Sequence, residues 1–233
     1  MAGGGSTITL GVMILMGMDA SVANGTNRIG LMVESTSGVL AFRSEKYSAF
    51  GESFKLSLFT LPGAILGAVF AIRISNEQFQ QILAVIMILI LITLFIPKTN
   101  KNKTLSLEKK GKKYLIYPAM VLIGFYGGFI QVGIGFLLMG ALRHLLNLDL
   151  VRVNMHKVFI VFVYTIPLLF VFGLTGNINW FYAFFLACGY AVGAWWSAKI
   201  SIAKGEKAIK VILAIAILIM ATKFLLSGTS VFI

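Results

Sequence analysis

Gly3-Gly4-Gly5-Ser6-Thr7-Ile8 opens a short apolar segment, and Gly133-Ile134-Gly135-Phe136-Leu137-Leu138 opens another one 130 residues later (133 minus 3). The same offset relates Asn24 to Asn154 downstream of the two glycine starts. This correspondence predicts that the chain contains two copies of one unit. Each copy is expected to begin with a short helix whose first turn is rich in glycine.

The composition indicates a membrane protein built from helices. Of the 233 residues, 58% are hydrophobic and only 12% are charged, and the mean hydropathy is +0.92, far from the balance of a soluble domain. No alternating strand pattern of the kind found in membrane barrels is present. The predicted fold class is therefore all-α, a polytopic membrane helical bundle. The apolar runs expected to form helices are 51–72, 79–96, 115–131, 151–172, 178–198 and 208–226.

The positive charge lies mostly between the apolar runs. A net charge of +12 would suggest nucleic-acid binding in a soluble chain, but here we interpret the lysines as signals of membrane topology. The stretch 98–113 carries seven lysines and is predicted to be a cytoplasmic linker. It separates a first repeat at 1–97 from a second at 114–233. We expect a multi-pass protein of the inner (plasma) membrane.

Counting the crossings predicts that the two repeats have opposite orientations. A second basic cluster, Lys199 to Lys210, should lie on the same side as the linker, so an even number of crossings must separate the two. Four segments achieve this if 115–131 and 133–146 form a pair that enters the membrane and returns. Each repeat then has five segments, an odd number, which makes this an inverted-topology repeat with one short or re-entrant helix per copy. If that pair were instead a single broken span, Arg143 and Arg152 would lie on the non-cytoplasmic side, against the rule that basic residues favour the cytoplasmic side.

The first repeat lacks a counterpart of one segment. The second has a full apolar lead-in at 115–132, whereas only Met1 and Ala2 precede Gly3. We expect that the lead helix of the first repeat is missing because the given chain begins inside the unit; the alternative is that this member has lost its first helix.

The stretch from Gly17 to Asn27, GMDASVANGTN, follows the first glycine start. Together with the basic central loop and the second glycine-led copy, it resembles the TauE/SafE family of sulfite and organosulfonate transporters. The resemblance covers essentially the whole chain, and this stretch is its most specific part. It implies an inner-membrane permease that exports or takes up small sulfur-containing anions. Substrates differ between members, so the resemblance does not fix the one used here.

The glycine starts are the first candidate binding elements. In a bilayer, glycine-interrupted segments at corresponding positions of two halves point to a transport site. The first backbone N–H groups of a helix have no partner within the helix and carry positive potential, which suits an anion. The alternative is that these glycines only allow helices to pack closely. The predicted binding residues here are Gly3, Gly4, Gly5, Ser6, Gly133 and Gly135.

A polar run in the first repeat is the second candidate. Polar groups at membrane depth normally line a cavity or pair with one another. Asn24, Thr26 and Asn27 are predicted to bind substrate, and Glu34 is the first candidate for proton coupling. Three roles are open for Arg28. It supplies positive charge to the anion, it forms an ion pair with Glu34, or its side chain extends to the membrane–water interface.

The corresponding run in the second repeat is the third candidate. Asn154 and Lys157 are predicted to bind the anion, and they share a helix face with Tyr164. His156 is the second candidate for proton coupling, because its pKa ordinarily lies near neutrality; the alternative is an ordinary interfacial histidine. Gln131, an isolated amide before the second glycine start, is added as a possible donor to the ligand.

Catalytic and metal chemistry find little support in the sequence. No HExxH, nucleotide-binding or GxSxG motif occurs, and the chain has two histidines and one cysteine, so we expect no enzyme, cofactor or metal. The expected partners are a small inorganic or organic anion and the lipid bilayer, with no nucleic acid. We predict a secondary transporter that works by alternating access. A passive anion channel and a non-transporting membrane subunit are the alternatives.

Overall fold

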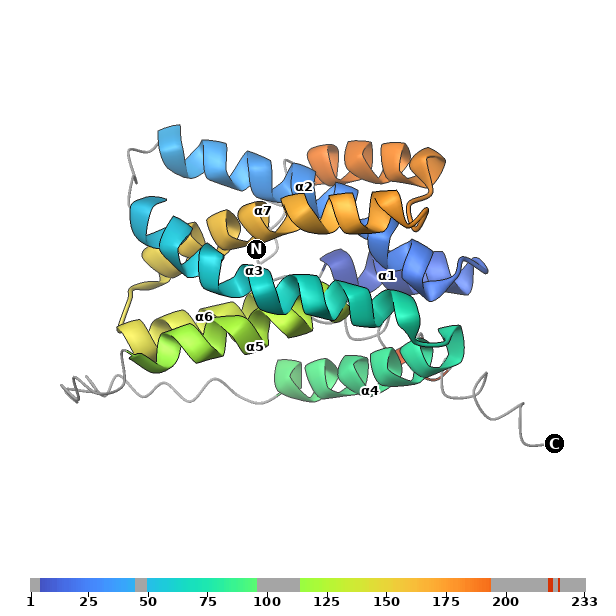
Figure 1. Cartoon of the computed structure of the whole chain (residues 1–233), viewed down its shortest axis with the longest axis horizontal. Helices are drawn as coiled ribbons and strands as arrows, with labels where there is room; N and C mark the ends of the chain where they lie inside the picture. Colours follow the sequence, from blue (N-terminus) through green and yellow to red (C-terminus); the bar gives the residue numbers. More distant parts are fainter. Residues whose placement is uncertain (1–4, 45–49, 96–113, 194–217, 220–221, 223–233) are drawn as a thin grey trace.

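The structure is a computed structural model that describes residues 5–44, 50–95, 114–193, 218–219 and 222. This part of the chain is helical and contains no strand, as the composition predicts. Figure 1 shows the long helices lying roughly side by side along the longest axis of the molecule. The helices are α1 (Gly5–Leu15), α2 (Ala20–Ser44), α3 (Phe50–Arg73), α4 (Asn76–Phe95), α5 (Ile116–Phe129), α6 (Ile134–Leu146), α7 (Leu150–Leu174) and an unlabelled helix at Trp180–Gly193.

The predicted apolar runs correspond closely to observed helices. α3 to α5, α7 and the Trp180–Gly193 helix each begin and end within a few residues of the expected boundaries. The predicted linker lies outside the described residues, as does almost all of the run 208–226. α2 was not among the apolar runs, but its polar residues were interpreted at helical spacing, and it is a continuous helix of 25 residues.

The starts of α6 and α7 have local causes. α5 ends at Phe129, and the chain then turns sharply, with φ of 68° at Gln131 and 74° at Gly133. Glycine adopts a positive φ without strain, whereas glutamine rarely does. α7 begins where the Asp149 carboxylate accepts hydrogen bonds from the backbone N–H groups of Val151 and Arg152, at 2.9 and 3.0 Å.

Glycines allow α3 and α5 to approach until their backbones touch. A Cβ atom added at Gly63 would lie 1.9 Å from the Val121 carbonyl oxygen, and one at Gly128 would lie 1.9 Å from the Ala64 carbonyl oxygen. Both distances are far below van der Waals contact, so no larger residue fits either position. Small residues at helix interfaces are the usual way in which membrane helices gain close packing.

α2 and α7 pack against each other in opposite directions. Gly25, near the start of α2, contacts Phe172 near the end of α7, whereas Gly38 contacts Val158 near the start of α7. Both helices have 25 residues, and their first residues are separated by the repeat offset of 130 (150 minus 20). α3 also packs against α7 (Figure 1), so α7 lies against both α2 and α3.

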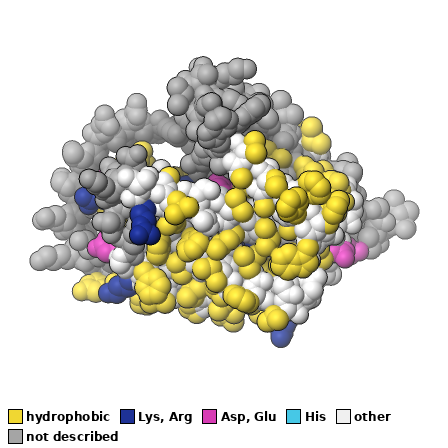
Figure 2. Space-filling model, turned by 90° about the horizontal axis from the view of Figure 1, so that it is seen from above, with side chains coloured by type: hydrophobic (Ala, Val, Ile, Leu, Met, Phe, Trp, Pro, Cys, Tyr) yellow, Lys and Arg dark blue, Asp and Glu magenta, His cyan; other side chains and the backbone are white. Residues whose placement is uncertain are grey.

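The outer surface suits a lipid environment. Figure 2 shows a face covered mainly by hydrophobic side chains, with most of the charged side chains in view toward its two ends. Leu66, Leu122 and Phe170 are each more than 60% exposed, and broad exposed apolar surface of this kind is unusual in a soluble monomer. Among the described residues, two helical segments are long and apolar enough to cross a membrane, Gly51–Arg73 and Leu150–Leu174.

Candidate functional site

The interior of the bundle is polar along α2. Asn24, Thr26, Asn27 and Arg28 are all 0% exposed. α2 therefore turns its polar face toward the interior, whereas a helix on the surface of a soluble domain turns its polar face toward the solvent. Because water is scarce at this depth, each of these groups must find a partner in the protein or in a ligand.

Two of the predicted binding residues hold neighbouring helices in place. The Asn24 side-chain amide donates to the Phe129 carbonyl oxygen at the end of α5, at 2.7 Å. The Thr26 hydroxyl accepts a hydrogen bond from the backbone N–H of Asn179, at 3.0 Å, next to the start of the Trp180–Gly193 helix. Both side chains thus satisfy backbone groups that a helix end leaves without an internal partner.

Asn27 sits in a small cluster that joins three helices. Its side-chain oxygen accepts hydrogen bonds from the Thr9 hydroxyl of α1 at 2.6 Å and the Tyr190 hydroxyl at 3.3 Å. Those two hydroxyls lie 3.1 Å apart, and Gly5 lies beside the Tyr190 ring. The Asn27 Nδ2 group has no hydrogen-bond partner among the described residues. One buried donor is therefore left for a ligand.

Sequence reasoning missed Thr9 and Tyr190. Both occur in apolar segments, where a single hydroxyl is usually satisfied by its own helix. Thr9 does contact the Gly5 carbonyl oxygen, at 3.1 Å. No signal in the sequence pairs it with a residue 181 positions away.

Arg28 is a buried cation next to the end of α5. Its Nη2 group donates to the carbonyl oxygens of Gly127 and Gly128, at 3.3 and 2.5 Å, and its guanidinium carbon lies 4.8 Å from the centre of the Phe172 ring. The Nε and Nη1 groups have no hydrogen-bond partner among the described residues. The alternative in which Arg28 forms an ion pair with Glu34 is wrong, because the side chains of residues six apart on a helix point in directions about 120° apart. Arg28 is also too deeply buried to reach the interface.

Glu34 of α2 lies near α7 instead. It interacts electrostatically with Lys157 of α7. Lys157 is 6% exposed, and its ammonium group donates to the Asn154 side-chain oxygen at 3.0 Å. The structure thus joins two predicted binding residues to the predicted coupling residue across the α2–α7 interface.

The second glycine start, just before α6, is a tight turn in which some of the backbone N–H groups already donate hydrogen bonds. The backbone N–H of Ile134 bonds to the Gln131 carbonyl oxygen at 3.3 Å, and that of Phe136 bonds to the Gly133 carbonyl oxygen at 2.9 Å. Fewer free donors therefore remain at this helix end than the sequence suggests. The Gln131 side chain is buried, and neither its oxygen nor its nitrogen has a partner among the described residues. Gly135 is buried in the first turn of α6.

The two glycine starts have different surroundings. Gly5 lies against Tyr190, whereas a Cβ at Gly133 would lie 2.7 Å from the Ile90 side chain of α4. Ser6 is buried in α1. Gly3 and Gly4 lie outside the described residues.

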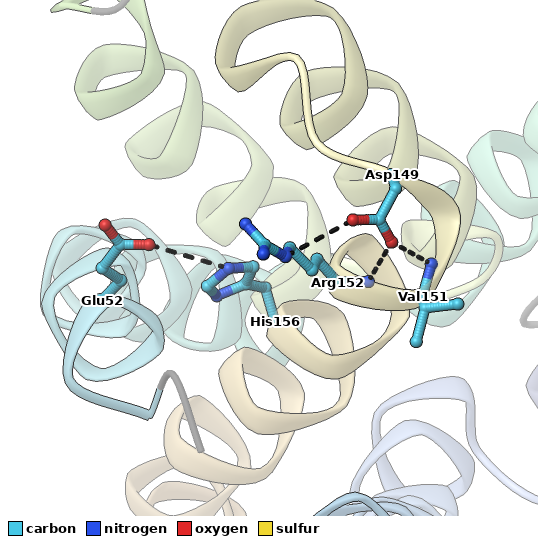
Figure 3. A network of polar contacts seen from close by, with 5 residues as sticks. All are labelled: Glu52, Asp149, Val151, Arg152 and His156. Carbon is cyan, nitrogen blue, oxygen red and sulfur yellow. Dashed lines mark hydrogen bonds and ion pairs between the residues drawn. The ribbon is translucent and has the colours of Figure 1, made fainter. Parts of the chain in front are cut away.

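His156 lies near the start of α7 and is 1% exposed, so it packs inside the protein. Its Nδ1 atom is 2.7 Å from the Ser53 hydroxyl of α3, and its Nε2 atom is 4.0 Å from the exposed Glu52 carboxylate. Figure 3 shows Glu52, His156, Arg152 and Asp149 in a row at this end of the helix. His156 thus links an interior helix contact to surface charges.

Asp149 ends this row at the surface. It forms an ion pair with Arg152, at 3.4 Å between Nε and Oδ2. Hydrogen bonds from the backbone, first from the Arg152 N–H, lower the pKa of the Asp149 carboxyl group.

The described residues contain no group of three or more histidine, cysteine, aspartate or glutamate side chains that could hold a metal ion. The site consists instead of amide, hydroxyl, ammonium and guanidinium groups. Most of these are hydrogen-bond donors, which favours an anion as the ligand.

A profile of the family described as "Sulfite exporter TauE/SafE" matches residues 1–224. The chain belongs to the TauE/SafE family. This confirms the resemblance seen in the sequence. No solved structure matches the chain significantly.

Curated relatives of this TauE/SafE chain carry transporter names. A "Probable membrane transporter protein" of Haemophilus influenzae is 28% identical over 225 residues, covering 95% of this chain and 87% of the relative. "Probable membrane transporter protein ORF9" of Sinorhizobium sp. is 26% identical, covering 98% and 87%. "Probable membrane transporter protein YfcA" of Escherichia coli K12 is 25% identical, covering 96% and 83%. With its apolar helices, the chain is accordingly a membrane transporter of the TauE/SafE family, which accords with the expectation that it is not an enzyme.

Proposed function

We propose that the chain is a secondary transporter that moves a small sulfur-containing anion, such as sulfite or an organosulfonate, by alternating access across the inner membrane. The observation that carries the proposal is the Asn27 cluster. It joins α1, α2 and the Trp180–Gly193 helix, and it keeps one buried amide donor without a partner among the described residues. An oxygen of the anion would accept that hydrogen bond.

The proposed transport path runs along the α2–α7 interface. The antiparallel packing of two helices at the repeat offset supports an inverted repeat, with the site on its pseudo-twofold axis. In this proposal Lys157 and Asn154 attract the anion from the second repeat. Gly5, Ser6, Gln131, Gly133 and Gly135 supply further contacts when the helices rearrange.

We propose that transport is coupled to protons through Glu34, with His156 as the second candidate. Glu34 faces the ammonium group that would bind the anion, so its protonation would change the charge at the site when the substrate enters or leaves. A passive channel built on the same scaffold would lack this coupling.

The test is uptake of sulfite and sulfoacetate by proteoliposomes that contain the purified chain. Asn27→Ala and Lys157→Ala should abolish uptake while the protein still folds. Asn177→Ala, which removes an amide from the exposed turn after α7, is the matched control and should transport normally. Wild-type uptake by the first two variants would refute the site assignment.

An imposed proton gradient tests the coupling separately. Accumulation of the anion against its own gradient would support a proton-coupled transporter. Equilibration that ignores the proton gradient would support the passive channel.

A further inference from the structure

We infer that Arg28 and Tyr164 form an oxyanion-binding site in which the Arg28 guanidinium is the principal cation and the Tyr164 hydroxyl a second donor. The inference rests on the proposed function and names the part of the interior that would recognise a charged substrate. The prediction drawn from the sequence gave the anion to the glycine starts, to amide and hydroxyl side chains and to Lys157, with Arg28 as a source of charge in one of its alternatives and Tyr164 in none.

The first argument is the unbalanced charge of Arg28. The guanidinium is 0% exposed and has no carboxylate partner among the described residues. Among the described residues, three neutral groups lie against it: the Asn24 side-chain oxygen at 3.4 Å, the partial negative charge at the end of α5 and the face of the Phe172 ring. A buried charge without a full counter-charge is costly. Within a membrane, such a residue usually marks a substrate or ion pathway.

The second argument is the number of unused donors. Arg28 has five N–H groups, and the three on Nε and Nη1 have no partner among the described residues. Capping the carbonyl oxygens of α5 needs only Nη2. A lysine or an amide could donate to these carbonyl oxygens equally well. Capping α5 therefore does not explain why the residue here is an arginine whose other donors lack a partner among the described residues.

The third argument is that Tyr164 approaches the same place from α7. It is 0% exposed, and its hydroxyl has no hydrogen-bond partner among the described residues. The hydroxyl lies 3.4 Å from the position that a Cβ on Gly127 would occupy, and the Gly127 carbonyl oxygen accepts a hydrogen bond from Arg28. Two buried donors from opposite repeats thus converge beside Gly127.

The chemistry favours an oxyanion. Guanidinium N–H groups and a phenol hydroxyl all donate to oxygen, and charge-assisted hydrogen bonds of this kind are the strong ones. Sulfite, sulfonate, sulfate, phosphate and carboxylate groups share that chemistry. Because both side chains are fully buried, an anion reaches them only when α2 or α7 moves away from α5.

The test measures how anions raise the Tm of the purified full chain in detergent. The anions are sulfite, sulfoacetate, sulfate, phosphate and acetate, each titrated as the sodium salt against sodium chloride at equal ionic strength. The variants are Arg28→Gln, whose amide can still donate to the Gly128 carbonyl oxygen, and Tyr164→Phe, which removes only an unpartnered hydroxyl. Arg152→Gln is the matched control, since it removes the same charge from an exposed arginine.

The expected result is that at least one oxyanion stabilises the wild type. Arg28→Gln should weaken that binding at least about tenfold, Tyr164→Phe about two- to tenfold, and Arg152→Gln not at all. If Arg28→Gln does not fold, Tyr164→Phe decides the matter, because losing an unpartnered hydroxyl does not threaten the fold.

The failures are distinguishable. Binding that survives both Arg28→Gln and Tyr164→Phe would overturn the inference while leaving the transporter proposal intact. Stabilisation by phosphate or acetate but not by sulfur oxyanions, lost in Arg28→Gln, would support the inference and refute the proposed substrate class. Absence of stabilisation by every oxyanion would overturn the inference.

Discussion

The α3–α5 interface and the α2–α7 interface are built on opposite principles. At the first, glycines bring two backbones into contact, and rings such as Phe70 and Phe129, 5.1 Å apart, fill the space beside them. At the second, charged and polar side chains face one another, and several buried polar atoms there have no partner among the described residues. The first interface has one dense arrangement, whereas the second has groups that a ligand or a shifted packing would satisfy. We infer that the α3–α5 pair is the scaffold and the α2–α7 pair is the moving part.

The largest effect is expected from Gly63→Ala in the scaffold. The new Cβ would lie 1.9 Å from the Val121 carbonyl oxygen, so α3 and α5 must separate. Overpacking of this kind costs roughly 1–3 kcal/mol, occasionally more. The yield of monodisperse protein and its Tm measure the loss. Gly140→Ala in α6 is the control, because a Cβ at this position would meet no described atom within 4 Å beyond its chain neighbours and its own helix backbone. Equal yield and Tm of the two variants would contradict the scaffold role.

The next effect concerns the charge pair across the second interface. Lys157→Met should destabilise the protein by roughly 1–3 kcal/mol, because Glu34 loses its counter-charge in a largely buried position. Adding Glu34→Gln should restore most of the stability while transport stays lost. A double-mutant cycle on Tm and uptake checks this. Additive losses would show that the two residues are not coupled.

A smaller effect is expected from Ser53→Ala, where α3 meets α7. The change removes the 2.7 Å hydroxyl partner of the buried His156 Nδ1 atom, and the loss of this single hydrogen bond should cost about 1 kcal/mol. Ser37→Ala is the control, because the Ser37 hydroxyl is exposed and its hydrogen bond is to the Val33 carbonyl oxygen of its own helix. If both variants show the same Tm, the Ser53–His156 contact contributes no stability.

The smallest effect is expected at Asp149, at the exposed start of α7. Because backbone hydrogen bonds lower the pKa of its carboxyl group below the ordinary value of 3.8, its contribution to stability is present at higher pH and is lost as the pH falls from about 3.8 toward the folded-state pKa. Asp149→Asn keeps a cap without a titrating group. Between pH 5 and pH 3 the wild type should therefore lose slightly more Tm than the variant. Parallel curves would contradict the cap.

The sequence predicted the scaffold better than the site. Apolar runs set the extents of α3, α5 and α7, and Gly133 correctly marked the start of α6, because these features depend on local hydrophobicity and backbone conformation. The inward polar run on α2 was also recognised. The contacts that the residues of this run make were not predicted. Arg28 bonds to α5 about 100 residues away, and the Thr9 and Tyr190 hydroxyls that meet at Asn27 are 181 residues apart in the sequence. Partners at that separation depend on how the helices pack, which no local pattern records.

The measurement that tests the central claim most directly locks α2 to α7. A Cβ at Gly38 would lie 3.2 Å from the Val158 Cβ, so the helices need to separate by only a few tenths of an ångström to reach the roughly 3.5–4.5 Å of a disulfide. Gly38→Cys with Val158→Cys can then be oxidised after Cys188→Ser removes the native thiol. Sulfoacetate uptake in proteoliposomes is then compared before oxidation, after oxidation and after reduction, with each single cysteine variant as control. We predict that the oxidised double variant stops transporting and recovers on reduction. Full uptake by the cross-linked protein would contradict a transport mechanism in which α2 and α7 move.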